Sequence, residues 1–299
     1  MSRLFQSRTP AQKVAVAAPA GAVRAEDLEA GLAVLRAALP EVEIRVDREV
    51  RDKRGYLAGS DPDRAAHLAS LCLDREVGAV VCARGGYGSS RLLPLLDIPA
   101  LVEAGCLLVG FSDVTCLLNA LAAAGLVTVH GPVITQLPRL DPASLAAMGK
   151  LLSGGNPWPL TLPGLCIAGG RAEGPLYGGN LSLLCHLMGT PWFPPLTGAV
   201  LFIEEVGESA YRLDRLLTQL ELAGVWRRVA GVAVGQVSGR PEEHGFLEEA
   251  VIRRLAGQGV PVVMDLPFGH GEQNLPLPLG ARAVLDGEQA ALTVGTNLA

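Results

Sequence analysis

Charged and aromatic residues are scarce in this sequence. Of its 299 residues, 18% are charged and 4% are aromatic, and 30 acidic against 25 basic side chains leave a formal net charge of −5. A protein that binds nucleic acid needs a basic surface to displace counterions from phosphates. No block of basic residues suggests a polybasic membrane patch, and no apolar run approaches the ~20 residues of a membrane span. We therefore expect neither a nucleic-acid partner nor a membrane partner.

Cysteine is also scarce and forms no recognisable motif. None of the six cysteines belongs to a C-x-x-C pair, and most have apolar neighbours, as in "VVCARGG" and "GCLLVGF". Disulfide frameworks are typical of much shorter secreted chains, so we expect buried, reduced thiols. Without an H-E-x-x-H motif or a Cys/His cluster, a zinc peptidase is disfavoured.

The N-terminus has only a loose similarity to a secretion signal. Arg3, Arg8 and Lys13 precede the apolar run "VAVAAPAGAV", which is the order of charge and apolar residues in a signal peptide. Pro19 and Gly21 interrupt that run, however, and an amphipathic helical pattern follows it directly, as after a first β-strand. We therefore expect a soluble, cytoplasmic protein.

The first half of the chain alternates short apolar runs with amphipathic segments. The runs at 78–83 and 106–110 are typical of strands buried on both faces of a parallel sheet. A helical spacing of apolar residues precedes them, at Leu28, Leu32, Leu35 and Leu39. This order predicts a doubly wound, flavodoxin- or Rossmann-like α/β domain over residues 1–140.

The second half has a different pattern. Residues 141–170 are rich in Pro, Gly and Ser and predict a linker region with one short helix. Residues 171–299 predict a smaller, mixed α+β domain with several strands and a hairpin that turns at Asp286-Gly287. The predicted fold class is therefore α/β with two domains.

Ser112 is the candidate nucleophile. In "LLVGFSDVT" an apolar strand ends at Gly110 and a helix begins near Val114, so the serine lies at the C-terminal edge of the sheet, where open α/β folds bind ligands. Free N–H groups at a helix N-terminus also favour developing negative charge. This resembles a nucleophile elbow, although the second glycine of G-x-S-x-G is missing and Asp113 follows the serine. The alternative is that Ser112 or Asp113 only caps the helix.

A glycine-rich segment, "ARGGYGSSR" at 83–91, occupies the preceding strand-to-helix corner. Its glycines allow the backbone to approach a ligand closely. It could cradle a phosphate, but the Walker lysine and the full G-x-G-x-x-G spacing are absent. It could instead form an oxyanion hole, in which the N–H near Gly86 and the N–H of Asp113 face the intermediate formed at Ser112. A plain glycine-rich turn is the third interpretation.

A serine nucleophile needs a base that a carboxylate orients. Among the five histidines, His270 lies between glycines on a loop after an apolar strand, free to point into a cleft. His130 and His186 are expected to be structural. Glu204 ends the apolar run of "AVLFIEE", where a buried charge requires a partner. The alternative is that Glu204 and Glu205 only mark where the strand reaches water.

Seven segments together resemble the LD-carboxypeptidase family (peptidase family S66), which includes the microcin-C immunity peptidases. They run in family order from about Val14 to Asp286, and their sequences are "RGGYGSSRLL", "GFSDVT", "HGPV", "EGPLYGGNLSLL", "GTPW", "LFIEEVGESAYRLDRLLTQL" and "LPFGHGEQNLPLPLGARAVLD". One such segment would be weak evidence, whereas seven in order are specific.

The resemblance implies a Ser112–Glu204–His270 triad and an oxyanion hole formed by the backbone of Gly86 and Asp113. It implies that the N-terminal domain carries the serine and the C-terminal domain carries the glutamate and the histidine, in a homodimer. The implied reaction releases terminal D-alanine from a murein tetrapeptide, or a related muropeptide, during cell-wall recycling, without a metal or other cofactor. Two further residues could contact the substrate, Arg84 at its carboxylate and Asn180 at its backbone, and the alternative for both is a structural role in their loops.

Two other functions stay open. A peptidase of the microcin-C immunity type would inactivate a peptide–nucleotide antibiotic, but after the "GGN" segment only Trp192 and Trp226 could stack on a nucleobase. Activity on such a conjugate and none on a tetrapeptide would favour it. A non-catalytic protein that binds a small anion at Gly85-Gly86 would not react with fluorophosphonates.

Overall fold

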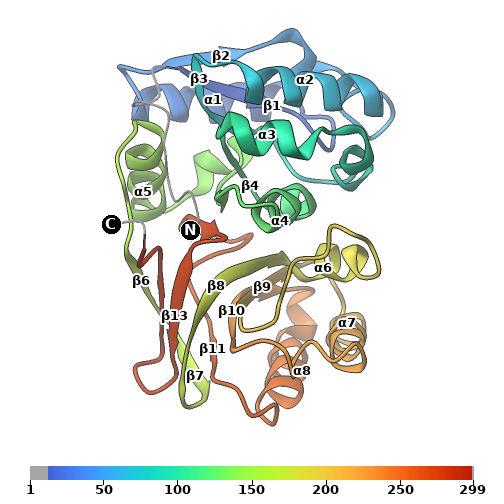
Figure 1. The fold of residues 1–299 in the computed structure, drawn as a ribbon, viewed down its shortest axis with the longest axis vertical. Coiled ribbons are helices and arrows are strands. Elements are labelled where there is room, and N and C mark those ends of the chain that lie inside the picture. The colour runs from blue at the N-terminus through green and yellow to red at the C-terminus, as the bar shows by residue number, and fades with distance from the viewer. Residues whose placement is uncertain (1–12, 298–299) are drawn as a thin grey trace.

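The computed structural model describes residues 13–297, so Arg3 and Arg8 of the signal-like N-terminus lie outside the described residues. Two β-sheets, one above the other in Figure 1, organise the chain. Within the described residues, no helix combines the length and the apolar character needed to cross a membrane.

The first sheet has the strand order β12-β5-β4-β3-β1-β2. Its first five strands in sequence are parallel, and they are β1 (Lys13–Ala17), β2 (Glu43–Val46), β3 (Val77–Cys82), β4 (Leu107–Gly110) and β5 (Thr128–His130). The order 2-1-3-4-5 is that of flavodoxin-like doubly wound folds, so the α/β prediction is confirmed. β3 and β4 are almost wholly buried, as their continuous apolar runs predict.

Helices cover this sheet in two groups. On one side α1 (Ala25–Ala38) packs against the 3-10 helix η4 (Ile134–Arg139) and against α5 (Pro142–Leu152). In the other group α2 (Asp61–Leu73) packs against α3 (Ile98–Ala104), and α3 packs against α4 (Thr115–Ala123). Three further 3-10 helices are η1 (Arg48–Arg51), η2 (Ser90–Leu95) and η3 (Ser112–Val114).

The second sheet has the order β6-β14-β13-β8-β9-β10-β11-β7. Its centre is parallel and consists of β8 (Arg171–Asn180), β9 (Val200–Val206), β10 (Gly231–Ser238) and β11 (Val262–Met264). The flanking strands are antiparallel, and they are β6 (Leu160–Pro163), β7 (Leu165–Ala168), β13 (Arg282–Asp286) and β14 (Ala291–Val294). β13 and β14 form the predicted hairpin at Asp286-Gly287.

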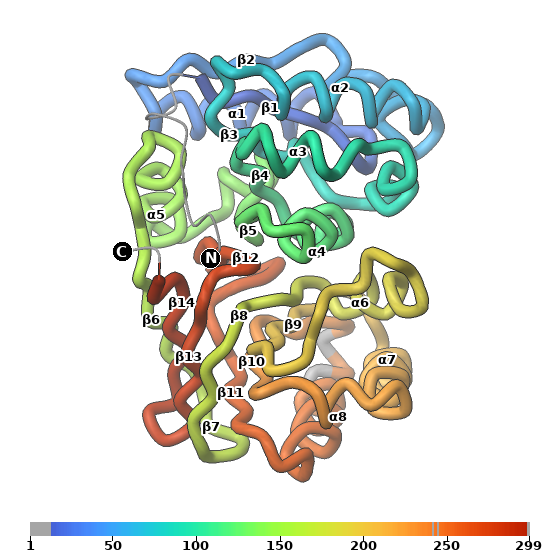
Figure 2. The backbone as a smooth tube through the Cα atoms, in the orientation of Figure 1, coloured from blue at the N-terminus to red at the C-terminus, as the bar shows by residue number. Residues whose placement is uncertain are grey.

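The outer layer of the second sheet is helical. It contains α6 (Leu181–Leu187), α7 (Ala210–Leu222) and α8 (His244–Leu255), preceded by the 3-10 helix η5 (Pro241–Glu243). α7 packs against both α6 and α8. Figure 2 shows these helices beside β9 and β10, at the right of the lower half.

Two segments tie the sheets together. Residues 141–170 contain α5, which packs against α1, and also β6 and β7, which pair with β14 and β11. Late in the chain, β12 (Leu277–Leu279) returns to the first sheet and pairs antiparallel with β5. Each sheet thus contains or contacts elements from segments that are distant in sequence. The domain boundaries at residues 140 and 170 stay a prediction.

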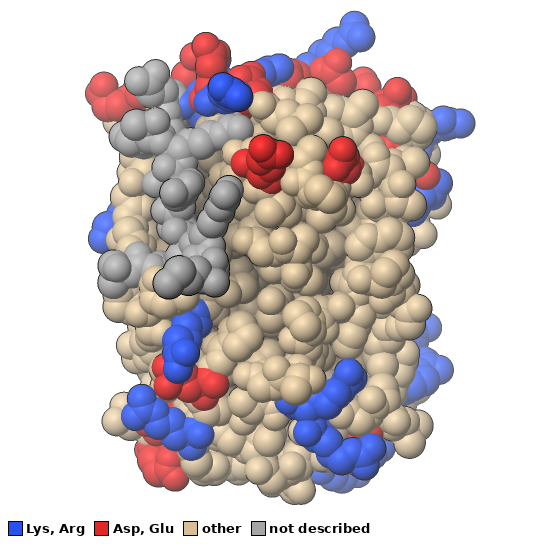
Figure 3. Space-filling view, viewed as in Figure 1, with Lys and Arg blue, Asp and Glu red and all other residues tan. Residues whose placement is uncertain are grey.

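The carboxyl ends of the central strands meet where the two sheets face each other. The Asn119 side chain on α4 donates to the Gly178 carbonyl (2.7 Å) and accepts from its N–H (3.2 Å). The N–H of Asn180, at the end of β8, donates to Thr115 Oγ1 (3.1 Å) at the start of α4. These bonds fix the end of β8 against the helix that follows Ser112. On the face shown in Figure 3, charged side chains gather toward the two ends of the molecule and the band between them is mainly uncharged.

Candidate active site

Ser112 lies on a strained turn. It directly follows β4 and Phe111, and its φ of +60° is in the left-handed region, which costs a residue with a side chain on the order of 1–3 kcal/mol. A Cβ atom built on Gly85 would lie 2.7 Å from Ser112 Cβ and 2.8 Å from Ser112 Oγ. Only glycine at position 85 therefore lets the glycine-rich segment approach the serine. The positive φ and the strand-to-helix position are those of a nucleophile elbow.

Asp113 fastens the glycine-rich segment to this turn. Its carboxylate is buried, and Oδ2 accepts from the Ser89 N–H (2.8 Å) while the Ser89 hydroxyl donates to the Asp113 carbonyl (2.5 Å). Burial raises the pKa of Asp113, and the hydrogen bonds from Ser89 and Gly88 offset part of that rise. Gly86 is exposed and has a φ of +105°. It lies between Gly85, which approaches Ser112, and Ser89, which hydrogen-bonds to Asp113. A Cβ atom built on the adjacent Gly85 would lie 3.3 Å from the Asp113 nitrogen, so the segment that contains Gly86 lies beside Asp113. The oxyanion role of the two N–H groups stays a prediction.

Glu204 and His270 are in direct contact. Glu204, on β9, is completely buried, and its Oε2 lies 2.6 Å from Nδ1 of His270, whose side chain is 20% exposed. The histidine ring in turn lies against the Phe111 ring, with 4.6 Å between ring centroids. Because Phe111 precedes Ser112, this contact places the histidine beside the serine turn. The buried Glu204 carboxylate therefore has the partner that its position requires.

His130 lies against Phe111, the same ring that His270 contacts. It ends β5, is fully buried, and contacts the rings of Phe111, Phe202 and Phe268 at centroid distances of 5.7, 5.1 and 6.1 Å. Neither ring nitrogen has a hydrogen-bond partner among the described residues. Burial lowers the pKa of His130 to about 4, with Glu204 opposing the shift and His270 adding to it. Sequence analysis expected a structural histidine whose hydrogen bonds are satisfied, whereas both nitrogens of this buried ring lack a partner among the described residues.

Glu205 has a separate role from its neighbour. It is buried, accepts from Asn180 Nδ2 (2.9 Å) and from the Ser182 N–H (2.9 Å), and its pKa is raised mainly by burial. Asn180 Oδ1 also caps α6 by accepting from the Leu183 N–H (3.3 Å). These contacts give Asn180 a structural role at the start of α6. Arg84, the other predicted substrate contact, is half-buried and donates from Nη1 to the Ala22 carbonyl (2.9 Å).

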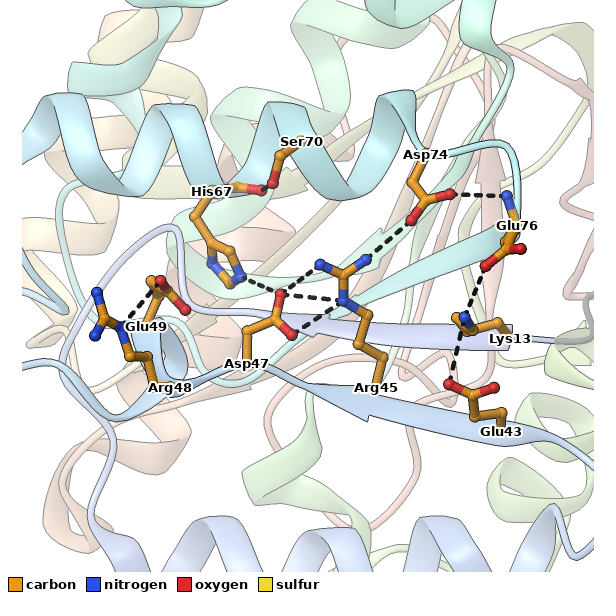
Figure 4. Close-up of polar contacts among 10 residues, drawn as sticks. All are labelled: Lys13, Glu43, Arg45, Asp47, Arg48, Glu49, His67, Ser70, Asp74 and Glu76. Atoms are coloured by element: carbon orange, nitrogen blue, oxygen red, sulfur yellow. Dashed lines mark hydrogen bonds and ion pairs between the residues drawn. The ribbon is translucent and has the colours of Figure 1, made fainter.

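A second polar cluster lies where the end of β2 and η1 meet α2 and is shown in Figure 4. Ligand-type atoms of Asp47, Glu49 and His67 lie within 4.8 Å of one another, a spacing that could hold a metal ion. However, the Arg45 guanidinium donates to both Asp47 oxygens at 2.9–3.1 Å and to Asp74 at 2.9 Å. This guanidinium holds the pKa of Asp47 below its usual value. We interpret the cluster as an ion-pair network that joins β2 to α2.

Sequence analysis missed one group of residues at the site. Three side-chain amides, those of Gln136, Gln236 and Asn274, hydrogen-bond to the loop that carries His270. Isolated Asn and Gln residues in separate segments form no pattern. The only available signal was that Asn274 lies within the family-like segment "LPFGHGEQNLPLPLG".

Both halves of the chain match known proteins. A model of the LD-carboxypeptidase N-terminal domain matches residues 14–131, and a model of the LD-carboxypeptidase C-terminal domain matches residues 173–285. The murein tetrapeptide carboxypeptidase of Pseudomonas aeruginosa is 37% identical over 293 residues, which cover 93% of this chain and 94% of the relative. The microcin C7 self-immunity protein MccF of Escherichia coli is 26% identical over 278 residues, or 80% of each chain. A solved structure of muramoyltetrapeptide carboxypeptidase from Oxalobacter formigenes has a TM-score of 0.80 at 29% identity, covering 94% of this chain and 97% of that one.

Proposed function

Because this chain belongs to the LD-carboxypeptidase family, we propose that it is a serine carboxypeptidase that releases terminal D-alanine from murein tetrapeptides. The observation that carries the proposal is the 2.6 Å contact between Glu204 and His270 beside the strained turn of Ser112. Three segments distant in sequence supply the three groups that a serine peptidase needs.

Each triad member has a defined task in this mechanism. The Glu204 carboxylate accepts from Nδ1–H of His270, which leaves Nε2 as the basic nitrogen. Nε2 takes the Ser112 hydroxyl proton while Oγ attacks the carbonyl carbon of the bond to D-alanine. Imidazolium then protonates the departing amine of D-alanine, and an acyl-enzyme remains. Water, deprotonated by His270, hydrolyses the ester and restores the serine.

The backbone stabilises the negative charge of the tetrahedral intermediates. The N–H groups of Gly86 and Asp113 are the proposed donors, and removing one such donor from a serine peptidase typically costs about 10²–10³ in rate. The Asp113 side chain does not take part in the reaction. It holds Ser89 and so keeps the glycine-rich segment against the serine turn.

The burial of Trp226 removes one of the two tryptophans on which the nucleobase of a peptide–nucleotide conjugate could stack. Trp226 is 2% exposed and Trp192 is half-buried, so Trp226 offers no open face on which a nucleobase could stack. We further propose, from the family resemblance, a cytoplasmic homodimer that acts in cell-wall recycling. Size-exclusion chromatography with light scattering would give a monomer mass if the dimer is wrong.

The experiment uses mass spectrometry on purified protein incubated with L-Ala-γ-D-Glu-meso-diaminopimelate-D-Ala, beside Ser112→Ala. The expected result is D-alanine release by the native protein only. Release by both proteins would keep the substrate and eliminate Ser112 as the nucleophile. If neither releases D-alanine, lysine-containing peptides and then an aminoacyl-sulfamoyl nucleoside are assayed, and cleavage of the nucleoside alone would replace the proposed substrate.

A further inference from the structure

The loop that carries His270 has little rigidity of its own. His270 lies between Gly269, whose φ is +126°, and Gly271, and glycine backbones have many accessible conformations. The bond to Glu204 fixes one ring nitrogen, but it does not fix the peptide groups on either side of the histidine. Because general-base catalysis requires Nε2 within about 3 Å of the serine oxygen, other contacts must hold this backbone.

Gln136 supplies two of these contacts. Its Nε2 donates to the Gly269 carbonyl (3.0 Å) and to the Gly271 carbonyl (3.1 Å), the two carbonyls that flank His270. Gln136 is 2% exposed, and its bond to the Gly269 carbonyl is buried while its bond to the Gly271 carbonyl is partly buried. A single amide group therefore holds both sides of the histidine.

Asn274 and Gln236 hold the N–H groups of the same two glycines. Asn274 Oδ1 accepts from the Gly269 N–H (3.1 Å), and Gln236 Oε1 accepts from the Gly271 N–H (2.5 Å). Asn274 Nδ2 also donates to Gln136 Oε1 (2.9 Å). We call Gln136, Gln236 and Asn274 the amide clamp. All three side chains are neutral, so they fix the loop without adding a charge beside the imidazole.

The backbone of Gln136 is anchored to the half of the molecule that carries the serine. The preceding residue, Thr135, donates its N–H to the carbonyl of Ala83 (3.0 Å), where the glycine-rich segment begins. One residue earlier, the Ile134 carbonyl lies so close to Gly31 on α1 that a Cβ atom there would overlap it. η4 therefore contacts the oxyanion segment with one residue and the His270 loop with the next.

We propose that Gln136 is a positioning residue, which through the amide clamp sets the distance of His270 from Ser112 and from the glycine-rich segment. The proposal rests on the proposed function in so far as Ser112 is the nucleophile. A displacement of about 1 Å in a reacting group can cost about 10²-fold in rate. Loss of the clamp should consequently lower kcat more than it changes KM, because substrate contacts elsewhere are retained.

The test compares Gln136→Met with Thr128→Val. Methionine keeps the volume of glutamine and removes the amide. Thr128→Val also removes a buried side-chain hydrogen bond, the one that Thr128 Oγ1 donates to the Leu118 carbonyl (3.0 Å). Among the described residues, the Thr128 side chain makes no hydrogen bond to the loop that carries His270. Three quantities are measured on the full chain: kcat and KM for the tetrapeptide, the rate of fluorophosphonate labelling, and the low-field proton signal of His270 Nδ1–H.

The expected result is a fall in kcat and in labelling rate of about 10- to 100-fold in Gln136→Met, with KM within about threefold and the low-field signal broadened or shifted. Thr128→Val should lower Tm and leave these quantities unchanged. If Gln136→Met lowers Tm but keeps native kcat, labelling and proton signal, its role is only structural and the proposal is wrong.

Two further controls keep the outcomes distinct. Should Gln136→Met not fold, Gln236→Met is judged by the same criteria, since Gln236 is half-buried and its loss is milder. Should the native protein release no D-alanine, the proposed substrate fails, while labelling and the proton signal still decide the role of the clamp. If a folded clamp variant then keeps the native rate of fluorophosphonate labelling and the native His270 proton signal, the proposed positioning role is wrong.

Discussion

Replacement of His130 by leucine should remove one source of acid sensitivity from the fold. The His130 ring is fully buried among phenylalanine rings, and neither nitrogen has a partner among the described residues. Burial lowers its pKa from 6.5 to about 4. Leucine has a similar volume and no group to leave unsatisfied, so it should fold.

The magnitude follows from proton linkage. Above pH 6.5 the ring is neutral in both the folded and the unfolded chain, and it contributes no pH dependence. As the pH falls below 6.5, the unfolded chain binds a proton that the folded protein excludes, so stability is lost until the pH reaches about 4. At about pH 5 the loss is roughly 1.36 × 1.5, or about 2 kcal/mol. At about pH 7.5 the contribution is close to zero.

Urea unfolding of the native protein and of His130→Leu at about pH 7.5 and about pH 5 measures the contribution of His130 to the free energy of unfolding. Other groups with shifted pKa values, such as Asp113 and Glu205, titrate in both proteins and cancel in the difference. We expect the free energy of unfolding of the native protein to fall by about 2 kcal/mol more than that of His130→Leu. Equal losses would mean that His130 has the same pKa in the folded protein as in the unfolded chain, and the reasoning from burial would be refuted.

Three other changes have specific expected outcomes. Gly85→Ala should lower fluorophosphonate labelling by about 100-fold or more with an unchanged circular dichroism spectrum, because the new Cβ lies 2.8 Å from Ser112 Oγ; native labelling would contradict this contact. Glu205→Gln should lower stability by about 1–3 kcal/mol in thermal unfolding, because the carboxylate accepts two hydrogen bonds at the start of α6 and one from the Val206 N–H at the end of β9; an unchanged Tm would argue against it. Of the six cysteines only Cys166 is exposed, so Ellman's reagent should titrate one thiol rapidly in the native protein and six in urea. Rapid reaction of two or more thiols in the native protein would refute the burial of the other five.

The first sheet was predictable because its chemistry is local. Strands buried on both faces must be continuously apolar, and "GAVVCA" and "CLLVG" show this directly. The strand β12 could not be predicted in the same way. It has three residues within a proline-rich segment, and its pairing of Leu277 with His130 is a contact over a long sequence separation. β6 and β7 are also short and partly exposed, so their sequences show no strand pattern and the segment suggested a linker.

The candidate site was predictable in its residue types and not in its geometry. The family-like segments indicated Ser112, Glu204 and His270 as a group. The residues alone favoured His270, on a loop between glycines, and Glu204, at the end of an apolar run, but they left capping and strand-end roles as alternatives. The amide clamp was not predictable, because an amide that supports a loop has no required spacing from it. The burial of His130 without a hydrogen-bond partner was not predictable either. It depends on three phenylalanine rings that come from separate segments of the chain, those of Phe111, Phe202 and Phe268.

The choice between Glu204 and Glu205 depends on the register of β9. Successive side chains of a strand point to opposite faces, so only one of two adjacent acids can reach His270. The pairing of Asn180 with Glu204 across β8 and β9 turns Glu204 toward the histidine and Glu205 toward the start of α6. A slip of one residue would exchange the two. Gly178 lies opposite Phe202, and a Cβ atom built on it would overlap the Phe202 carbonyl, so only glycine fits at this position of the register. Packing within the second sheet thus decides which of the two adjacent acids faces His270.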